Sequence, residues 1–223
     1  MKLYIVRHGE TLFNFLERVQ GWSDSPLTPK GEEQGKAVGK HLAQYDFDAI
    51  FSSDLKRATD TANYILEHQS AENNIQTTPL LREAYFGGFE GGSETGPWGP
   101  IYKKYGYPVE EIETNYDESM KKVMTHVSNE ESRDMIAEND ELNLAENFEQ
   151  FQNRVNTFVE KISNMQEVEK VAIVCHGGTA RLILEILLGT SEKIIEVDNC
   201  STSIIEVKNE GNKLIKFNDT SYL

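Results

Sequence analysis

The sequence predicts an α/β fold on a mostly parallel sheet, because short apolar runs alternate with segments of helical periodicity. A buried strand is expected at residues 2–6 (KLYIV), a helix in LTPKGEEQGKAVGKHLAQ, and a second short strand at 48–52. The run VAIVC at 171–175, followed by TARLILEILLG, repeats the pattern further along. Strands that alternate with helices usually pair in parallel through right-handed crossovers.

Local signals place each element in the first half of the chain. Thr28 is a suitable N-cap and Pro29 a suitable first residue for the first long helix. The segment SDLKRATDTANYILEH predicts a second helix with one apolar face. A third short strand is expected at IQTT, and the glycine-rich piece LLREAYFGGFEGG is expected to be a loop.

The second half begins with an acidic segment of poor periodicity. We expect residues 97–147 to form an inserted, partly helical cap within a single domain that spans 1–223. The segment ENFEQFQNRVNTFVEKI predicts an amphipathic helix, and Gly189 should end the helix after 171–175. The stretch TSIIEVKNEGNKLIKF predicts a β-hairpin around Glu210-Gly211.

Composition narrows the class of partner. The 223 residues carry a formal net charge of −15, which argues against nucleic acid or an anionic membrane. No apolar run is long enough to span a bilayer, and no signal peptide is recognisable. Cys175 and Cys200 lack metal or disulfide spacing, and Cys175 is expected to be a buried structural thiol. We therefore expect a cytoplasmic protein. The sequence does not indicate whether the chain is a monomer or an oligomer.

Two predicted strands end in a histidine, His8 after Arg7 and His176 before a Gly-Gly pair. Gly9, directly after His8, is expected to permit close approach of the backbone to a ligand. The carboxyl ends of parallel strands meet at one edge of a sheet, where ligands bind in open α/β folds. Arg57 falls in a first helical turn, where a cation opposes the helix dipole unless it holds an anion. Glu83 begins the glycine-rich loop and is a candidate general acid.

Each of these residues alone has an ordinary structural explanation, but the set indicates a focused positive pocket. Such a pocket suits a dianionic phosphoryl group, which a histidine can attack to form phosphohistidine. His41, His68 and His126 are expected to have no catalytic role, and no histidine pair has metal-ligand spacing. We therefore predict no catalytic metal.

The chain resembles the histidine phosphatase superfamily, also called the phosphoglycerate mutase-like family. The resemblance covers residues 3–189 and rests on YIVRHGETLFN, GWSDSPLTPKGEEQGKAVG, FSSDLKRATDTA, LREAYFGGFEG and IVCHGGTARLILEILLG. It implies a three-layer α/β/α sandwich and chemistry without a metal. It also implies that His8 takes the phosphoryl group, that Glu83 serves as acid and then base, and that Arg7, Arg57 and a charged His176 hold the phosphoryl oxygens. The residues that match the lining of the phosphate pocket are Thr11, Asn14, Gln20, Gly21 and Gly177.

Members of the resembled family are phosphatases or mutases, and the sequence favours a phosphatase acting on a small phosphorylated metabolite. Cofactor-dependent mutases use an adjacent arginine pair to bind the substrate carboxylate, and this chain has none. The chain also has a short segment after its final hairpin, where mutases have an extended tail. A mutase primed by 2,3-bisphosphoglycerate remains the alternative. A protein phosphatase or a non-catalytic scaffold is less favoured, and the phosphatase itself needs no cofactor.

A set of aromatic side chains suggests room for an organic leaving group. The aromatic residues in question are Trp22, Phe86, Phe89, Trp98 and Tyr102.

Overall fold

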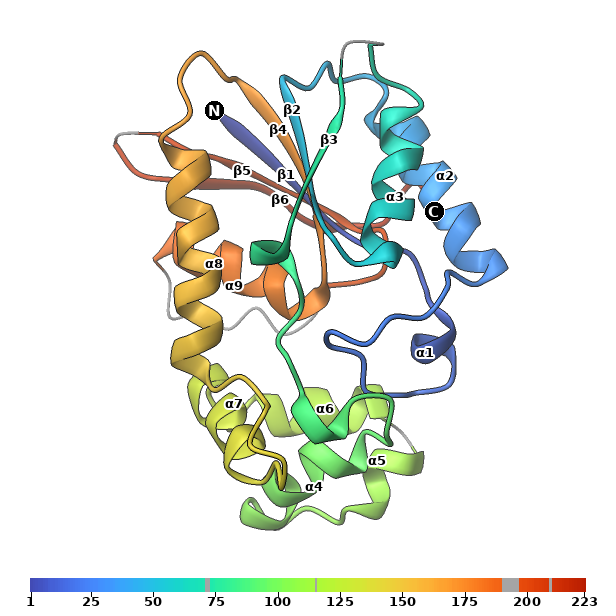
Figure 1. Ribbon diagram of the computed structural model, residues 1–223, viewed down its shortest axis with the longest axis vertical. Helices are drawn as coiled ribbons and strands as arrows, with labels where there is room; N and C mark the ends of the chain where they lie inside the picture. Colours follow the sequence, from blue (N-terminus) through green and yellow to red (C-terminus); the bar gives the residue numbers. More distant parts are fainter. Residues whose placement is uncertain (71–72, 115, 190–196, 209) are drawn as a thin grey trace. The chain divides into compact units, whose positions relative to one another are not determined.

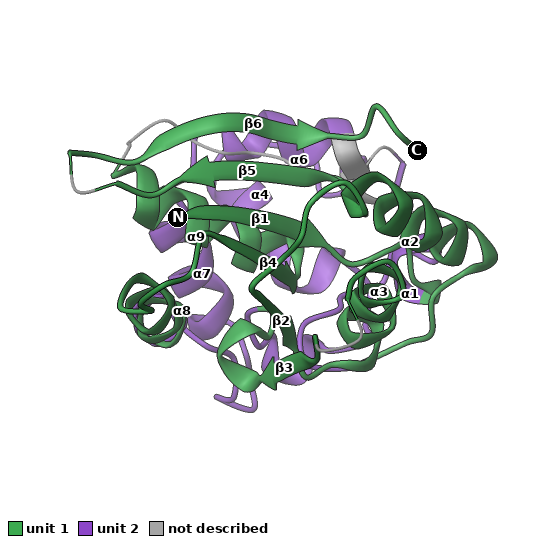
Figure 2. Ribbon diagram, turned by 90° about the horizontal axis from the view of Figure 1, so that it is seen from above, with its two compact units in different colours: residues 1–12, 24–83, 154–223 green, residues 13–23, 84–153 purple. Residues whose placement is uncertain are grey.

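The computed structural model describes residues 1–70, 73–114, 116–189, 197–208 and 210–223, in two compact units. The first unit comprises Met1–Leu12, Asp24–Glu83 and Arg154–Leu223, and the second comprises Phe13–Ser23 and Ala84–Asn153 (Figure 2). The predicted insertion at 97–147 falls inside the second unit. That the chain is one domain stays a prediction.

The described part of the first unit contains a six-stranded sheet in the order β3-β2-β4-β1-β5-β6. Its strands are β1 (Lys2–Arg7), β2 (Ala49–Ser53), β3 (Ile75–Thr78), β4 (Lys170–Cys175), β5 (Thr202–Glu206) and β6 (Lys213–Asp219). Strand β1 is parallel to β4, and β2 is parallel to both β4 and β3. These three parallel pairings confirm the mostly parallel sheet. Strand β5 is antiparallel to β1 and β6, which confirms the predicted final pair of antiparallel strands.

Helices cover both faces of this sheet, as the three-layer prediction requires (Figure 1). Helices α2 (Pro29–Leu42) and α3 (Lys56–Leu66) lie on one face, and α8 (Phe148–Ser163) and α9 (Gly177–Leu188) lie on the other. Alternation along the strands supplies both cores. Tyr4 and Val6 of β1 join the buried cluster with α2 and α3, whereas Phe51 of β2 meets Phe158 of α8 edge to face at 5.5 Å.

The predicted helix signals operate as expected. The Thr28 side chain accepts a hydrogen bond from the Gly31 N–H at 3.0 Å, and Pro29 opens α2. Gly189 ends α9 in the left-handed conformation at φ 57°, which a residue without Cβ adopts at little cost. The second strand begins one residue later than predicted, at Ala49.

The second unit is mainly helical. It contains α4 (Thr95–Lys104), α5 (Glu110–Thr114), α6 (Tyr116–Met124) and α7 (Asn129–Glu138), and α1 (Leu12–Phe15) begins in the first unit and ends in the second. The glycine-rich segment is not wholly irregular, because short 3₁₀ turns form at Pro79–Leu81 and Gly87–Phe89. Among the described residues, no helix has the length and apolar character needed to cross a membrane.

Candidate active site

The parallel pairing of β1 with β4 brings the two predicted histidines together. Arg7 lies opposite Cys175 in the register, so His8 and His176 follow on neighbouring strands. The His8 N–H donates to the Cys175 carbonyl at 3.0 Å, and the two imidazole rings lie 5.1 Å apart between centroids. Both side chains are buried, with 3% and 1% of their surface exposed. The expectation that the sheet juxtaposes them is confirmed.

Hydrogen bonds define the tautomer of His8. Its Nδ1 lies 2.8 Å from the Gly9 carbonyl oxygen, which can only accept, so Nδ1 carries the proton. The Arg57 Nε–H donates to His8 Nε2 at 3.3 Å, and a guanidinium can only donate. The lone pair of His8 is therefore on Nε2, the nitrogen that faces the arginine.

The surroundings keep His8 uncharged. Burial lowers the pKa of His8 well below its usual value, and the positive charges of Arg57 and Arg7 lower it further. A neutral imidazole is the nucleophilic form, so the same positive charges that attract an anion keep the ring reactive.

A carboxylate that the sequence analysis did not single out holds Arg57 in place. Arg57 is 1% exposed, and its Nη1 forms an ion pair with Asp24 Oδ1 at 3.0 Å. Asp24 Oδ2 also accepts the backbone N–H of Lys56 at the start of α3, where Leu55 offers no side-chain cap. A cation at the start of a helix interacts unfavourably with the helix dipole, and the negative charge of Asp24 compensates for this interaction.

Three residues of the segment before β5 hold the Arg7-His8 pair. Arg7 Nη1 donates to the Val197 carbonyl at 2.7 Å, and Asn199 Nδ2 donates to the His8 carbonyl at 2.9 Å. The Cys200 N–H donates to the Arg7 carbonyl at 3.0 Å.

The two thiols are structural. Burial raises the pKa of Cys175 far above its usual value, and burial raises the pKa of Cys200 to about 12. The expectation that Cys175 is a buried structural thiol is confirmed, and Cys200 acts here through its backbone.

His176 has one ring nitrogen committed to the protein. Its Nε2 lies 2.8 Å from Ser53 Oγ, whereas its buried Nδ1 has no hydrogen-bond partner among the described residues. Burial lowers the pKa of His176 well below its usual value, and Arg57 and His8 add to the shift. These shifts argue against the expectation of a charged His176. A neutral ring that accepts from Ser53 at Nε2 would present Nδ1–H as a donor.

Glu83 lies at the N-terminus of α9. Its Oε2 accepts the Gly178 N–H at 2.8 Å, directly after His176 and Gly177. A Cβ on Gly178 would lie 2.6 Å from Glu83 Oε1, so a side chain at this position would displace the carboxylate. The first unit therefore gathers Arg7, His8, Arg57, Glu83 and His176 around one end of the parallel strands.

Gly9 has a different role from the one its motif suggested. We expected it to allow close approach of a ligand, but a Cβ there would lie 2.5 Å from the Gly31 carbonyl oxygen. The close approach is between the loop after β1 and the start of α2. The Gly9 N–H donates to Thr61 Oγ1 at 3.0 Å, which fixes the turn against α3.

The predicted phosphate-lining residues divide between the two units. Thr11 and Gly177 belong to the first unit. Thr11 is buried, lies three residues after His8 and forms an isolated antiparallel β-bridge with Leu27. Gly177 lies close to Arg7, since a Cβ on Gly177 would be 3.5 Å from Arg7 Nε. Asn14, Gln20 and Gly21 belong to the second unit, and their role in binding phosphate stays a prediction.

Glu90 organises the segment that contains Gly21. Its carboxylate accepts the backbone N–H groups of Gly21, Trp22 and Ser23 at 3.1, 2.8 and 2.9 Å. A Cβ on Gly21 would lie 2.3 Å from the Ala84 carbonyl oxygen. Packing alone therefore requires glycine at this position.

The aromatic residues expected to face a substrate are mostly packing residues. Trp98 and Tyr102 lie in the buried cluster of the second unit, and Phe86 and Phe89 pack against it. Trp22 stacks on Tyr85 with ring centroids 4.8 Å apart. The interpretation of Trp98 and Tyr102 as a substrate lining is wrong, because both side chains are buried in the core of the second unit.

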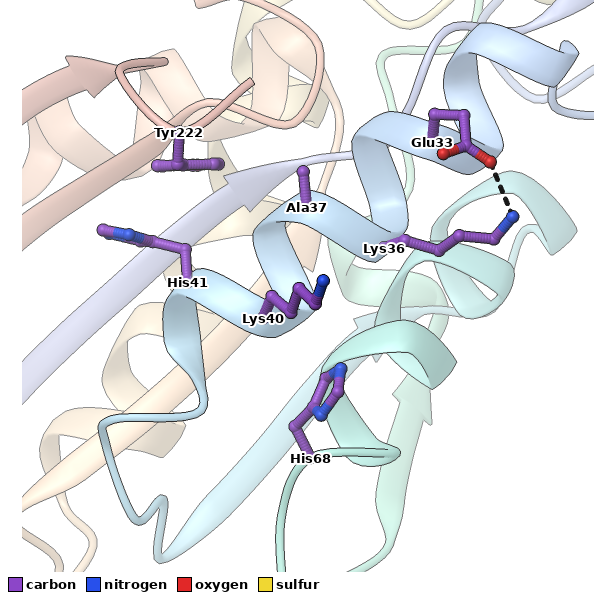
Figure 3. A pocket seen from close by; sticks show the side chains of 7 residues that line it. All are labelled: Glu33, Lys36, Ala37, Lys40, His41, His68 and Tyr222. Atoms are coloured by element: carbon purple, nitrogen blue, oxygen red, sulfur yellow. Dashed lines mark hydrogen bonds and ion pairs between the residues drawn. The ribbon is translucent and has the colours of Figure 1, made fainter.

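The remaining histidines of the first unit border a separate hollow of about 780 Å³ on α2 (Figure 3). His41 stacks on Tyr222 at 4.1 Å between ring centroids, and Lys36 pairs with Glu33 at 2.7 Å. Burial lowers the pKa of His41. None of the candidate catalytic residues lines it.

Comparisons with known proteins agree with this arrangement. A profile of the histidine phosphatase superfamily, branch 1, matches residues 3–106 and 105–220. The chain is 30% identical to a broad-specificity phosphatase of Saccharomyces cerevisiae over 96% of this chain and 83% of that protein. It is 31% identical to a 2,3-bisphosphoglycerate-dependent phosphoglycerate mutase of Treponema denticola over 92% of this chain and 85% of that protein. The crystal structure of a phosphoglycerate mutase from Bacillus anthracis superposes with a TM-score of 0.84 at 31% identity, covering 100% of this chain and 94% of that one.

The lowered pKa of His8 predicts how stability depends on pH. An unfolded histidine takes up a proton near pH 6.5, whereas folded His8 stays neutral below that pH. The unfolded state therefore gains protons first, and the free energy of unfolding falls as the pH drops from 7 towards 5.5. His8→Gln should reduce this slope by up to about 1.4 kcal/mol per pH unit in denaturant titrations. Identical slopes for both proteins would show that His8 titrates normally in the fold.

Proposed function

Because the chain belongs to the histidine phosphatase superfamily, we propose that it hydrolyses phosphomonoesters through a phosphohistidine at His8. The observation that carries this proposal is the His8 tautomer. The Gly9 carbonyl holds the proton on Nδ1, so the Nε2 lone pair is directed at Arg57 in a buried, positively charged site. A group in this state can attack phosphorus without first losing a proton.

In the first half-reaction, the Nε2 lone pair of His8 forms the P–N bond as the ester P–O bond breaks. Arg57 transfers its Nε–H donation from the imidazole to a phosphoryl oxygen, and Arg7 and the His176 Nδ1–H bind the other oxygens. Glu83 donates a proton to the leaving oxygen. The imidazole becomes positive, and the Gly9 carbonyl 2.8 Å from Nδ1 stabilises that charge.

In the second half-reaction, water attacks phosphorus in line with the P–N bond. The Glu83 carboxylate accepts a proton from this water, the P–N bond breaks, and the electron pair returns to Nε2. Inorganic phosphate leaves, and the site returns to its starting state. Two guanidinium groups supply the positive charge for both steps, and we propose no metal ion or resident cofactor.

We favour hydrolysis of a small phosphorylated metabolite over mutase activity. The sequence contains no adjacent pair of arginines to bind a substrate carboxylate. Phosphatases and mutases are both among the similar proteins, so the two activities have to be measured together.

The test is one incubation with 3-phosphoglycerate and a 2,3-bisphosphoglycerate primer, and a parallel incubation with an aryl phosphate. We expect phosphate release from the aryl ester without 2-phosphoglycerate, unaffected by a metal chelator. His8→Ala should lower the rate by on the order of 10³-fold or more, since it removes the nucleophile. Rapid formation of 2-phosphoglycerate would identify a mutase, and a rate that survives His8→Ala would exclude the mechanism.

Asp24 should matter for the reaction although it touches no reacting atom. Asp24→Asn weakens the charge-assisted contact that orients Arg57, and we expect kcat/KM to fall by roughly 10-fold to 100-fold. Asp60→Asn is the matched control, because Asp60 pairs with exposed Lys56 on the same helix. If both substitutions change kcat/KM by the same small factor, Asp24 does not orient Arg57 for the reaction.

A further inference from the structure

Glu83 lies in a segment without helix or strand, and its position therefore depends on contacts from other elements. The segment follows the 3₁₀ turn at Pro79–Leu81. A proton donor must be held within hydrogen-bond distance of the leaving oxygen, so a loose segment at this point would reduce catalysis. The position of the Glu83 carboxyl group therefore depends on the contacts that hold residues 80–83.

The side chain of Arg154, on α8, binds three carbonyl oxygens of this segment. Its Nη1 donates to Leu80 at 3.1 Å and to Arg82 at 2.8 Å, and its Nη2 donates to Glu83 at 3.0 Å. One guanidinium thus reaches the carbonyl of Glu83 itself and two carbonyls just before it.

Two further contacts hold the neighbouring Arg82. Its side chain makes a two-pronged ion pair with Asp54 at 2.7 and 2.6 Å, and Thr179 Oγ1 donates to its carbonyl at 2.8 Å. These contacts anchor the residue before Glu83, and Thr179 Oγ1 also lies 3.4 Å from Glu83 Oε1. Arg154 is the contact that holds the Glu83 carbonyl. Arg154 connects α8 with the acid, and Gly178 connects α9 with it.

We propose that Arg154 is a positioning residue that holds Glu83 where it can protonate the leaving group. The proposal rests on the proposed phosphatase function. The role requires arginine, because the planar guanidinium presents several fixed N–H groups and a lysine ammonium cannot reproduce this geometry. Sequence reasoning did not single out Arg154, since it lies 71 residues from Glu83 within an ordinary amphipathic helix.

Leaving-group dependence distinguishes this role from a general structural one. A nitrophenolate leaves readily without a proton, whereas an alkoxide needs one. The experiment compares wild-type protein with Arg154→Lys on nitrophenyl phosphate and on an alkyl phosphate such as glycerol phosphate. We compare kcat/KM, which reports phosphoryl transfer to His8 and not the later attack of water that both esters share. We expect kcat/KM to fall at least ~10-fold for the alkyl ester and by less than about 3-fold for the aryl ester. Substrate contacts should be unaffected, because Arg154 binds backbone carbonyls of the protein.

The ratio of the two kcat/KM values is the decisive quantity, because a partly unfolded variant loses both in equal proportion. Lys161→Met, which removes a cation from the same helix α8, should leave the ratio unchanged. Glu83→Gln should change the ratio as Arg154→Lys does, and the double variant should be no worse than Glu83→Gln alone.

Two results would overturn the proposal. An equal loss of kcat/KM on both esters, or a further loss in the double variant, would make Arg154 a structural residue independent of the acid. A wild-type protein that hydrolyses neither ester would instead overturn the proposed function, so the two failures are distinguishable.

Discussion

The structure of the candidate site depends on one register, the parallel alignment of Arg7 with Cys175 across β1 and β4. A shift by one residue would turn each following side chain to the other face of the sheet. In the observed register His8 and His176 meet at one edge, and hydrogen bonds to β4 and to the segment before β5 hold the Arg7-His8 pair. The buried runs of β1 and β4, packed between helices on both faces, maintain that register.

Burying Arg57 and two histidines beside the partly buried Arg7 carries an electrostatic cost, and the protein offsets it in specific ways. Arg57 has Asp24, Arg7 has the Val197 carbonyl, and the imidazoles stay neutral. With a net charge of −15 on the whole protein, this pair of arginines is a local exception. A dianionic phosphoryl group would accept hydrogen bonds from the two guanidinium groups, which is a physical reason for binding such a group here.

The order of strands, the helix caps and the conjunction of Arg7, His8, Arg57, Glu83 and His176 could be predicted from local patterns and short motifs. The contacts made by Asp24, Glu90 and Arg154 could not, because each joins segments far apart in sequence and a single acid or arginine has no distinctive pattern. The motif predicts that Gly9 makes room for a ligand, whereas in the structure Gly9 makes room for the backbone of Gly31. Trp98 and Tyr102 were assigned to a lining where they form a core. The cytoplasmic location, the substrate and the contribution of Asn14, Gln20 and Gly21 stay predictions.

The central claim is that His8 carries the phosphoryl group during turnover. The most direct measurement mixes the protein with a ³²P-labelled phosphomonoester, quenches within the first turnovers in alkali, and maps the label by peptide. The account predicts label on the peptide that contains His8, stable in alkali and lost in acid, as expected of a phosphoramidate. Rapid phosphate release with no labelled protein, or label on the peptide that contains His176, would contradict it.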